Sequence, residues 1–151
     1  MKIQGSIEIN APRNKVIEYF SNPEYLKEYQ DGFVSKELIS GNFGQNGAVS
    51  KMLYQTGKRK MTLVETIINN DFPESFDAHY HHKFMDNTMK CYFQELDSST
   101  TKYSYEVEYT RINWFLPKLM ALLFPSIYRK QIEKWVRQFK HFVENQMQIQ
   151  N

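Results

Sequence analysis

The feature that most constrains the fold is a long amphipathic segment near the C-terminus, residues 126–146. Its apolar side chains recur every three or four residues, which is the periodicity of one face of an α-helix. That face carries Tyr128, Ile132, Trp135, Val136, Phe139, Phe142 and Val143, whereas charged residues fill the other face. The pattern predicts one long helix whose aromatic face must be covered by another element of the fold.

An N-terminal strand followed by two short helices is predicted next. Residues 2–10 alternate between polar and apolar side chains, as a strand with one buried face does. Pro12 suits the start of a first helix. Asn22 is a suitable N-cap and Pro23 a suitable first residue for a second helix, which Gly32 can end.

Between residues 33 and 110, strand patterns follow one another with short connections. Turn signals at residues 41–47, 57–58, 69–73, 86–87 and 97–99 divide this region into six strands. Within residues 60–68 either alternate set of side chains fits an inward face, so two registers stay open. A seven-stranded antiparallel sheet needs a cover, and only the C-terminal helix is long and apolar enough to supply it. We therefore predict an α+β helix-grip fold, a single domain over residues 1–151, in which a curved sheet wraps around that helix and leaves a pocket.

Aromatic residues are unusually frequent, with 10 Tyr, 11 Phe and 2 Trp among 151 residues. Such side chains fill cores, and they also line cavities, where tyrosine combines an apolar ring with a polar tip. The net charge of +2 and the lack of a long basic run argue against a nucleic-acid partner. A single cysteine, Cys91, excludes an internal disulfide, and residues 1–10 lack the apolar run of a signal peptide. A cytoplasmic location is therefore expected.

The glycine-rich run GNFGQNG, residues 41–47, resembles a phosphate-binding loop only in composition. Such a loop leads from a strand through the glycines into a helix. Here the strand pattern of residues 48–54 follows instead. A hairpin loop is the better interpretation, and the sequence implies no cofactor.

Several stretches follow one another in an order typical of a known superfamily. SIEINAPRNKVIEYFSNPEYLKEY, residues 6–29, resembles its first strand and helix pair, and ISGNFGQNGAVSKMLY, residues 39–54, resembles its second hairpin. The turn NDFPESF, residues 70–76, and the closing helix follow in the expected positions. This superfamily is the START-like, Bet v 1-like (SRPBCC) group of polyketide cyclase/dehydrase and lipid transport proteins. The resemblance, over residues 2–145, implies a cavity for an apolar or amphipathic small molecule but no single chemistry.

Three histidines and the only cysteine lie close together, in HYHHKF at residues 79–84 and at Cys91. A two-residue turn at residues 86–87 predicts the cross-strand pairs Phe84–Met89, His82–Cys91 and Tyr80–Phe93. This face is mostly apolar, so we expect it to line the cavity. The opposite, mostly polar face carries Asp77, His79, His81, Lys83, Lys90, Tyr92 and Gln94.

A metal site on the polar face is not favoured. His79 and His81 could supply half of a ligand set, with Asp77 and Gln94 as the nearby candidates to complete it. The face is expected to be open to water, whereas a structural zinc site is a closed tetrahedral set. Cys91 points to the other face. We predict solvated histidines and no bound metal.

His82 is the candidate catalytic residue. Burial lowers the pKa of a histidine, and the neutral imidazole can act as a general base next to a carbonyl group. Two other roles stay open, because His82 can also orient a ligand through one hydrogen bond or satisfy a buried tyrosine hydroxyl. The predicted inward face holds no carboxylate that would orient the imidazole, and this weakens the hypothesis of an enzyme.

The apolar run of residues 112–128 is too short and too interrupted to predict a membrane span. One interpretation is a buried helix start that is interrupted at Pro117 and Pro125. The other is a gate over the cavity mouth, or a patch over residues 112–125 that touches a membrane transiently. Solvent exposure distinguishes the two interpretations.

The leading functional hypothesis is a non-enzymatic binding or carrier protein for a lipid-like or polyketide-like molecule. One alternative is a cyclase-like or dehydratase-like enzyme that uses His82 with Tyr80 or Tyr105. Another is a regulatory protein-interaction module with a filled core, which a cavity smaller than about 300 Å³ would favour. The predicted ligand-binding residues are Tyr80, His82, Phe84, Met89, Cys91, Phe93, Tyr103, Tyr105, Trp135 and Phe139.

Overall fold

The computed structural model describes residues 1–113, 115–123 and 125–150. Its strands are β1 (Lys2–Ile9), β2 (Phe33–Ser40), β3 (Val49–Thr56), β4 (Arg59–Asp71), β5 (Ser75–His82), β6 (Met85–Asp97) and β7 (Thr100–Ile112). Its helices are α1 (Arg13–Ser21), the 3₁₀ turn η1 (Pro23–Tyr25), α2 (Leu26–Tyr29), α3 (Phe115–Leu123) and α4 (Pro125–Ile149). The predicted order of strand, short helices, six strands and a long C-terminal helix is confirmed.

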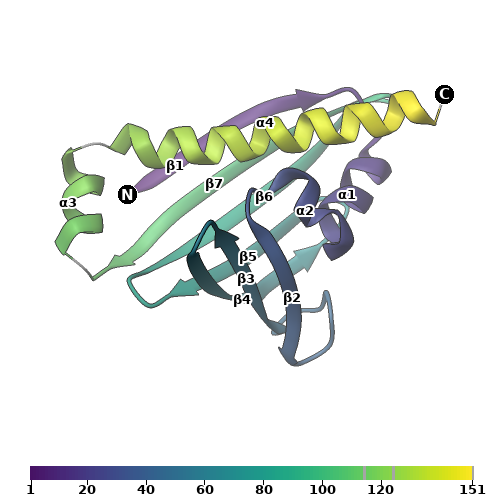
Figure 1. Ribbon diagram of the computed structural model, residues 1–151. Coiled ribbons are helices and arrows are strands. Elements are labelled where there is room, and N and C mark those ends of the chain that lie inside the picture. Colours follow the sequence, from purple (N-terminus) through teal and green to yellow (C-terminus); the bar gives the residue numbers. More distant parts are fainter. Residues whose placement is uncertain (114, 124, 151) are drawn as a thin grey trace.

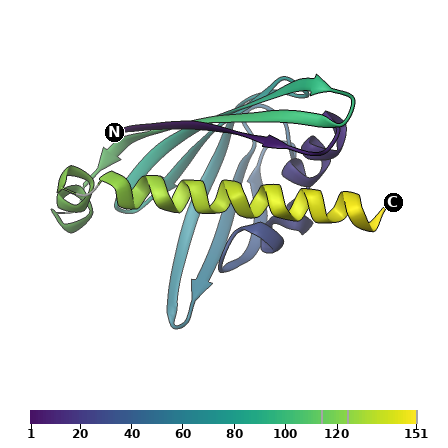
Figure 2. The same cartoon turned by 90° about the horizontal axis from the view of Figure 1, so that it is seen from above.

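The seven strands form one antiparallel sheet in the order β1-β7-β6-β5-β4-β3-β2. The long helix α4 runs across one face of this sheet, close to β1 and β7, while α1 and α2 lie near its C-terminal half (Figure 1). Figure 2 shows the sheet curving around the helix, with α3 set apart at the other end. This arrangement is the predicted helix-grip fold, because the concave face of the sheet has α4 as its cover.

Local sequence signals position the short helices. Pro12 precedes α1, and the side chain of Asn22 accepts a hydrogen bond of 3.0 Å from the backbone N–H of Glu24 at the start of η1. Gly32 follows α2 with a φ of +77°, a conformation that glycine adopts without steric cost. A Cβ there would also approach the carbonyl oxygen of Gln55 to 2.8 Å, so this turn into β2 requires glycine.

An aromatic core joins α1, the sheet and α4. The ring of Phe20 makes edge-to-face contacts with Phe93 at 5.1 Å and with Phe139 at 6.0 Å between centroids. Phe20 also packs against Phe76 at 5.7 Å. Contacts of this kind add to the burial of apolar area and fix α1 against both the sheet and α4.

The predicted turn between β5 and β6 is wrong. These strands connect through residues 83–84, so the observed pairs are His82–Met85, Tyr80–Asn87 and Phe76–Cys91. The shift preserves the alternation of faces but removes His82 from its expected place opposite Cys91.

An ion-pair cluster explains why residues 86–87 do not form the turn. The guanidinium of Arg111, on the neighbouring β7, donates hydrogen bonds of 2.7 and 2.9 Å to the two carboxylate oxygens of Asp86. His81 Nδ1 lies 2.6 Å from Asp86 Oδ1. These charge-assisted contacts hold Asp86 within β6, and the turn therefore forms three residues earlier.

The apolar run of residues 112–128 forms a separate helix, α3, and the start of α4, with Trp114 and Phe124 outside the described residues. The expectation of a buried helix start is wrong for two of its side chains, because Phe115 is 76% and Leu122 is 78% exposed. Helix α3 ends at Leu123 and α4 begins at Pro125, and the two helices run in different directions (Figure 1). Pro117 lies in the first turn of α3, where a missing N–H removes no helical hydrogen bond.

Candidate functional site

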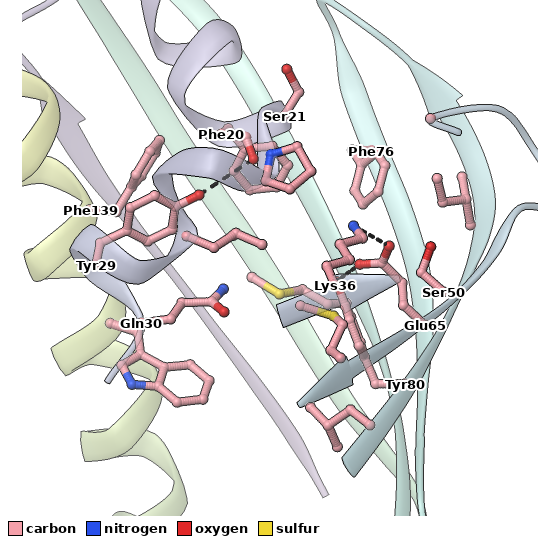
Figure 3. Close-up of a pocket in the computed structure, with 18 of the residues that line it drawn as sticks. Phe20, Ser21, Tyr29, Gln30, Lys36, Ser50, Glu65, Phe76, Tyr80 and Phe139 are labelled. Atoms are coloured by element: carbon pink, nitrogen blue, oxygen red, sulfur yellow. Dashed lines mark hydrogen bonds and ion pairs between the residues drawn. The ribbon is translucent and has the colours of Figure 1, made fainter. Parts of the chain in front are cut away.

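A cavity of about 520 Å³ lies between the concave face of the sheet and α4. Its walls come from α1, α2, α4 and the strands β2 to β7 (Figure 3). This volume is above the limit of about 300 Å³ below which a filled core would be the better description. The chain therefore encloses space for a small molecule.

Most of the wall is aromatic or aliphatic. Phe72 and Phe76 stack with 5.4 Å between their ring centroids, and Trp135 of α4 stacks on Tyr54 of β3 at 6.5 Å. Met52, Leu63, Ile67 and Met89 add aliphatic surface from the sheet. A lining of this kind favours an apolar ligand by removing its surface from water.

One polar cluster interrupts the apolar wall. Lys36 Nζ lies 2.7 Å from Glu65 Oε1, and the Tyr80 hydroxyl donates a hydrogen bond of 2.9 Å to Glu65 Oε2. The side chains of Lys36 and Glu65 are only 13% and 5% exposed. Burial, and then the neighbouring Glu65 carboxylate, raise the pKa of Tyr80 well above its ordinary value, so its hydroxyl stays protonated.

Strand alternation brings these three side chains together from three neighbouring parts of the sheet. Lys36 of β2 pairs with Met52 of β3, and Glu65 of β4 pairs with Tyr80 of β5. All four residues line the cavity, as does Ser50 of β3, which pairs with Glu65. Figure 3 shows Lys36, Ser50, Glu65 and Tyr80 on one side of the pocket, facing Tyr29, Gln30 and Phe139.

A second polar contact lies on the side of the cavity formed by α2. The hydroxyl of Tyr54 donates a hydrogen bond of 2.6 Å to Gln30 Oε1. Burial raises the pKa of Tyr54 above its ordinary value, and so does the charge of Glu65. Tyr29 donates its own hydroxyl to the backbone carbonyl of Tyr19, at 3.2 Å. These tyrosines stay neutral and act as hydrogen-bonding groups rather than as charges.

The cavity mouth lies where lining residues are also exposed. Phe43 in the β2–β3 loop is 52% exposed, and it lines the cavity together with Gly44 and Gln45. Its ring lies 5.7 Å from Lys36 Nζ. The glycine-rich run is thus a hairpin loop, as predicted, and it forms part of the cavity wall rather than a phosphate site.

Five of the ten predicted ligand-binding residues line the cavity. They are Tyr80, Met89, Tyr103, Trp135 and Phe139. The strand alternation and the helix periodicity that identified them depend on local sequence only, and both patterns hold in the structure.

Two of the other five lie at the β5–β6 turn, away from the cavity lining. His82 ends β5, and its Nδ1 accepts a hydrogen bond of 3.3 Å from the backbone N–H of Phe84 in the turn. Partial burial lowers the pKa of His82, and the neighbouring Lys83 lowers it further. The neutral imidazole expected from sequence is therefore supported, but the placement of His82 in the cavity is wrong.

The remaining three are buried behind the lining. The thiol of Cys91 lies 3.3 Å from the Tyr103 hydroxyl, and the ring of Phe93 stacks on Tyr103 with 5.3 Å between centroids. Tyr105 packs over Gly5 of β1, where any Cβ would overlap its hydroxyl. All three are buried, and none of them is among the residues that line the cavity.

Lys36, Ser50 and Glu65 were not among the predicted site residues. Glu65 belongs to the region where two registers were open, and the structure selects the set that contains Leu63, Glu65 and Ile67. In β2 the pairing with β3 is irregular at two positions, so the sequence pattern around Lys36 has no clear alternation. The only sequence signal for an inward position was that Lys36 and Glu65 each have apolar residues two positions before and after them.

The described residues contain no group of three or more His, Cys, Asp or Glu side chains able to hold a metal ion. His81 is instead part of the cluster with Asp86 and Arg111, where the guanidinium lies 3.4 Å from His81 Nδ1.

Within the described helices, no segment is long and apolar enough to cross a membrane.

Comparisons with known proteins support the fold. No family model and no curated protein matches the sequence. The Zhui aromatase/cyclase from Streptomyces sp. R1128 is similar in structure at 9% identity, with a TM-score of 0.78 over 97% of this chain and 95% of that one. A conserved protein from Geobacillus kaustophilus matches with a TM-score of 0.78 at 14% identity, over 96% of each chain. Ara h 8.0201 matches with a TM-score of 0.70 at 13% identity, over 95% of this chain and 97% of that one.

At these identities the likeness defines the class of fold and not the chemistry. The chain has the helix-grip fold that its sequence resemblance implied, and it shares this fold with the solved structures named above. That class includes proteins described as cyclases, so the ligand and any reaction must be argued from the residues of the cavity.

Proposed function

We propose that this chain is a single-domain binding or carrier protein for a hydrophobic or amphipathic small molecule. The molecule is held between the sheet and α4. The observation that carries the proposal is the cavity of about 520 Å³, with aromatic walls and one polar cluster. Sites for small molecules have this size and are mostly apolar, with a few polar groups that fix orientation. A regulatory module with a filled core is not favoured, because its core would leave no such space.

A ligand in this cavity contacts residues from both walls. The proposed contacts are Lys36, Ser50, Glu65, Tyr80, Met89, Tyr103, Trp135 and Phe139. Trp135 provides a reporter, because its indole ring is part of the lining.

The test is displacement of a fluorescent apolar probe from delipidated protein by a panel of fatty alcohols, sterols and aromatic polyketides. Saturable binding of one molecule per chain, with a change in the emission of Trp135, is the expected result. The variant Trp135→Phe controls for the signal of the other tryptophan. No displacement across the panel, together with no small molecule in native mass spectra of the purified protein, contradicts the proposal.

The buried carboxylate favours a second candidate function, a cyclase-like enzyme. Proton removal next to a carbonyl needs a base inside the cavity, and Glu65 is a carboxylate in that place. His82 is not proposed for this role, because it lies at the β5–β6 turn. If a substrate is found, Glu65→Gln should abolish turnover while binding persists, and turnover at the unchanged rate contradicts this candidate.

The exposed helix α3 supports the earlier interpretation of residues 112–125 as a membrane contact. Phe115 and Leu122 present apolar side chains to solvent, and Lys118 on the same helix is exposed. Exposed apolar side chains beside a lysine suit a surface of anionic lipids. We propose that α3 touches such a surface while ligand is loaded. The cytoplasmic location expected from the sequence stays a prediction.

A further inference from the structure

The charges of the cavity wall cancel. Among the described residues that line the cavity, Lys36 and Glu65 are the only ones charged at neutral pH. Their charged atoms lie 2.7 Å apart, so the wall carries one ammonium, one carboxylate and no net charge. An ion pair with such low exposure is costly to separate, because each charge depends on the other for compensation.

The hydrogen-bonding groups of the cluster are complementary to an uncharged oxygen. An ammonium has three N–H donors, and Lys36 places its Nζ 2.7 Å from Glu65 Oε1 as an ion pair. The Tyr80 hydroxyl donates to Glu65, which leaves its oxygen able to accept. The buried hydroxyl of Ser50, on the strand between Lys36 and Glu65, can do either. The cluster therefore offers both donors and acceptors next to an apolar space.

We propose that the cavity selects uncharged apolar molecules that carry a hydroxyl or carbonyl oxygen, and that it discriminates against the corresponding carboxylate anions. The oxygen accepts from Lys36, and a hydroxyl can also donate to Tyr80 or Ser50. This inference rests on the proposed binding function and names the class of ligand.

The reason for the discrimination is electrostatic. A carboxylate at the cluster would compete with Glu65 for Lys36 and would place two anions beside a single cation, within a poorly hydrated wall. A like charge in such a place weakens binding, whereas a neutral oxygen brings no such electrostatic cost. A site for fatty acids would instead need a cation without a carboxylate partner.

The experiment compares four probes with the same hydrocarbon chain on the wild-type protein: dodecanol, methyl dodecanoate, dodecanoate and dodecane. At about pH 8 the acid is ionised, so the probes share one hydrocarbon chain and differ in the charge and the oxygen groups at its end, with one further methyl group in the ester. Dodecanol and methyl dodecanoate should bind at least about tenfold more tightly than dodecanoate, and more tightly than dodecane. Equal or tighter binding of dodecanoate overturns the inference but leaves the proposed function intact. Binding of none of the four overturns the inference, whereas the proposed function falls only if the wider panel of sterols and aromatic polyketides also fails to bind.

A variant that removes the charge of Glu65 tests whether the polar cluster causes the discrimination against carboxylates. Glu65→Gln keeps the shape and a hydrogen-bond acceptor for Tyr80, but it leaves Lys36 as an unpaired cation. The preference for dodecanol over dodecanoate should then fall by about tenfold or reverse. Glu106→Gln is the matched control, because it removes the same charge from an outward pair with Lys2. An unchanged preference in Glu65→Gln overturns the inference, and if that variant does not fold, the wild-type comparison decides alone.

Discussion

The polar wall of the cavity and the surface of α3 depart from the usual distribution of side chains in opposite ways. The wall places Lys36 and Glu65 where apolar side chains are expected, and α3 places Phe115 and Leu122 where polar ones are expected. In the cavity wall, the buried charges are compensated by the ion pair between Lys36 and Glu65 and by a hydrogen bond from Tyr80 to Glu65. Outside, Phe115 and Leu122 remain exposed in the free protein. The ion pair of the wall therefore needs no further partner, whereas the exposed apolar side chains of α3 gain stability only when another surface covers them.

Breaking the ion pair from one side should have the largest effect. Lys36→Met leaves the Glu65 carboxylate, 5% exposed, without its cation, so the free energy of unfolding should fall by about 3–5 kcal/mol. Urea unfolding monitored by circular dichroism measures this loss. The triple variant Lys36→Met/Glu65→Leu/Tyr80→Phe should recover most of it, because neither a charge nor an unpaired hydroxyl of the cluster then remains. Lys2→Met, in an exposed pair, is the control, and an equal loss in that variant contradicts the account.

Polar substitutions on α3 should weaken membrane binding while leaving the stability of the fold nearly unchanged. Phe115→Glu/Leu122→Glu should change the free energy of unfolding by less than about 0.5 kcal/mol, because both side chains are exposed. The same variant should bind vesicles of mixed neutral and anionic lipids at least about tenfold more weakly, since two apolar side chains lose a partner surface. Co-sedimentation with vesicles measures this difference. Undiminished association of the variant would show that α3 is not the contact.

The cluster of Asp86, Arg111 and His81 anchors the end of β7 from which α3 continues. Hydrogen bonds from Arg111 and then from His81 hold the pKa of Asp86 well below its usual range. A lowered pKa in the folded state contributes stability at neutral pH, and this contribution is lost as the pH falls below about 4. Asp86→Asn should therefore cost about 1 kcal/mol near pH 7 and progressively less in acid. Thermal unfolding across this pH range, with the exposed Asp71→Asn at the end of β4 as control, measures the difference.

The smallest effect is expected at Cys91, which lies behind the cavity lining. Burial raises the pKa of its thiol to about 12, so the reactive thiolate is scarce at physiological pH. The thiol should not react with maleimide in the folded protein and should react fully in urea. Mass spectrometry of labelled samples measures both. Rapid labelling of the folded protein would mean that the cavity reaches Cys91 after all.

The parts of the fold that depend on local pattern could be predicted from the sequence. The alternation in β1 and β7 and the periodicity of α4 predicted which side chains face inward, including Tyr103 and Phe139. The turn between β5 and β6 could not be predicted, because it depends on Arg111, which lies 25 residues from Asp86 in the sequence. A side chain so remote outweighed the local preference of Asp and Asn for turns.

The polar half of the site was missed for a related reason. In β4 both alternate sets of side chains contain apolar residues, so only pairing with β3 and β5 selects the face that includes Glu65. In β2 the irregular pairing hides the inward position of Lys36. Each charged residue looks surface-exposed in isolation, and the ion pair becomes visible only when three strands are brought together.

The measurement that tests the central claim most directly is ligand binding by a variant with a filled cavity. Ser50 points into the cavity, and the adjacent Lys51 of the same strand is exposed, so Ser50→Phe and Lys51→Phe place the same ring on opposite faces of β3. Dodecanol binding, measured by titration of both folded variants, should be lost in Ser50→Phe and unchanged in Lys51→Phe. Retained affinity in Ser50→Phe would contradict the claim that the ligand lies between the sheet and α4.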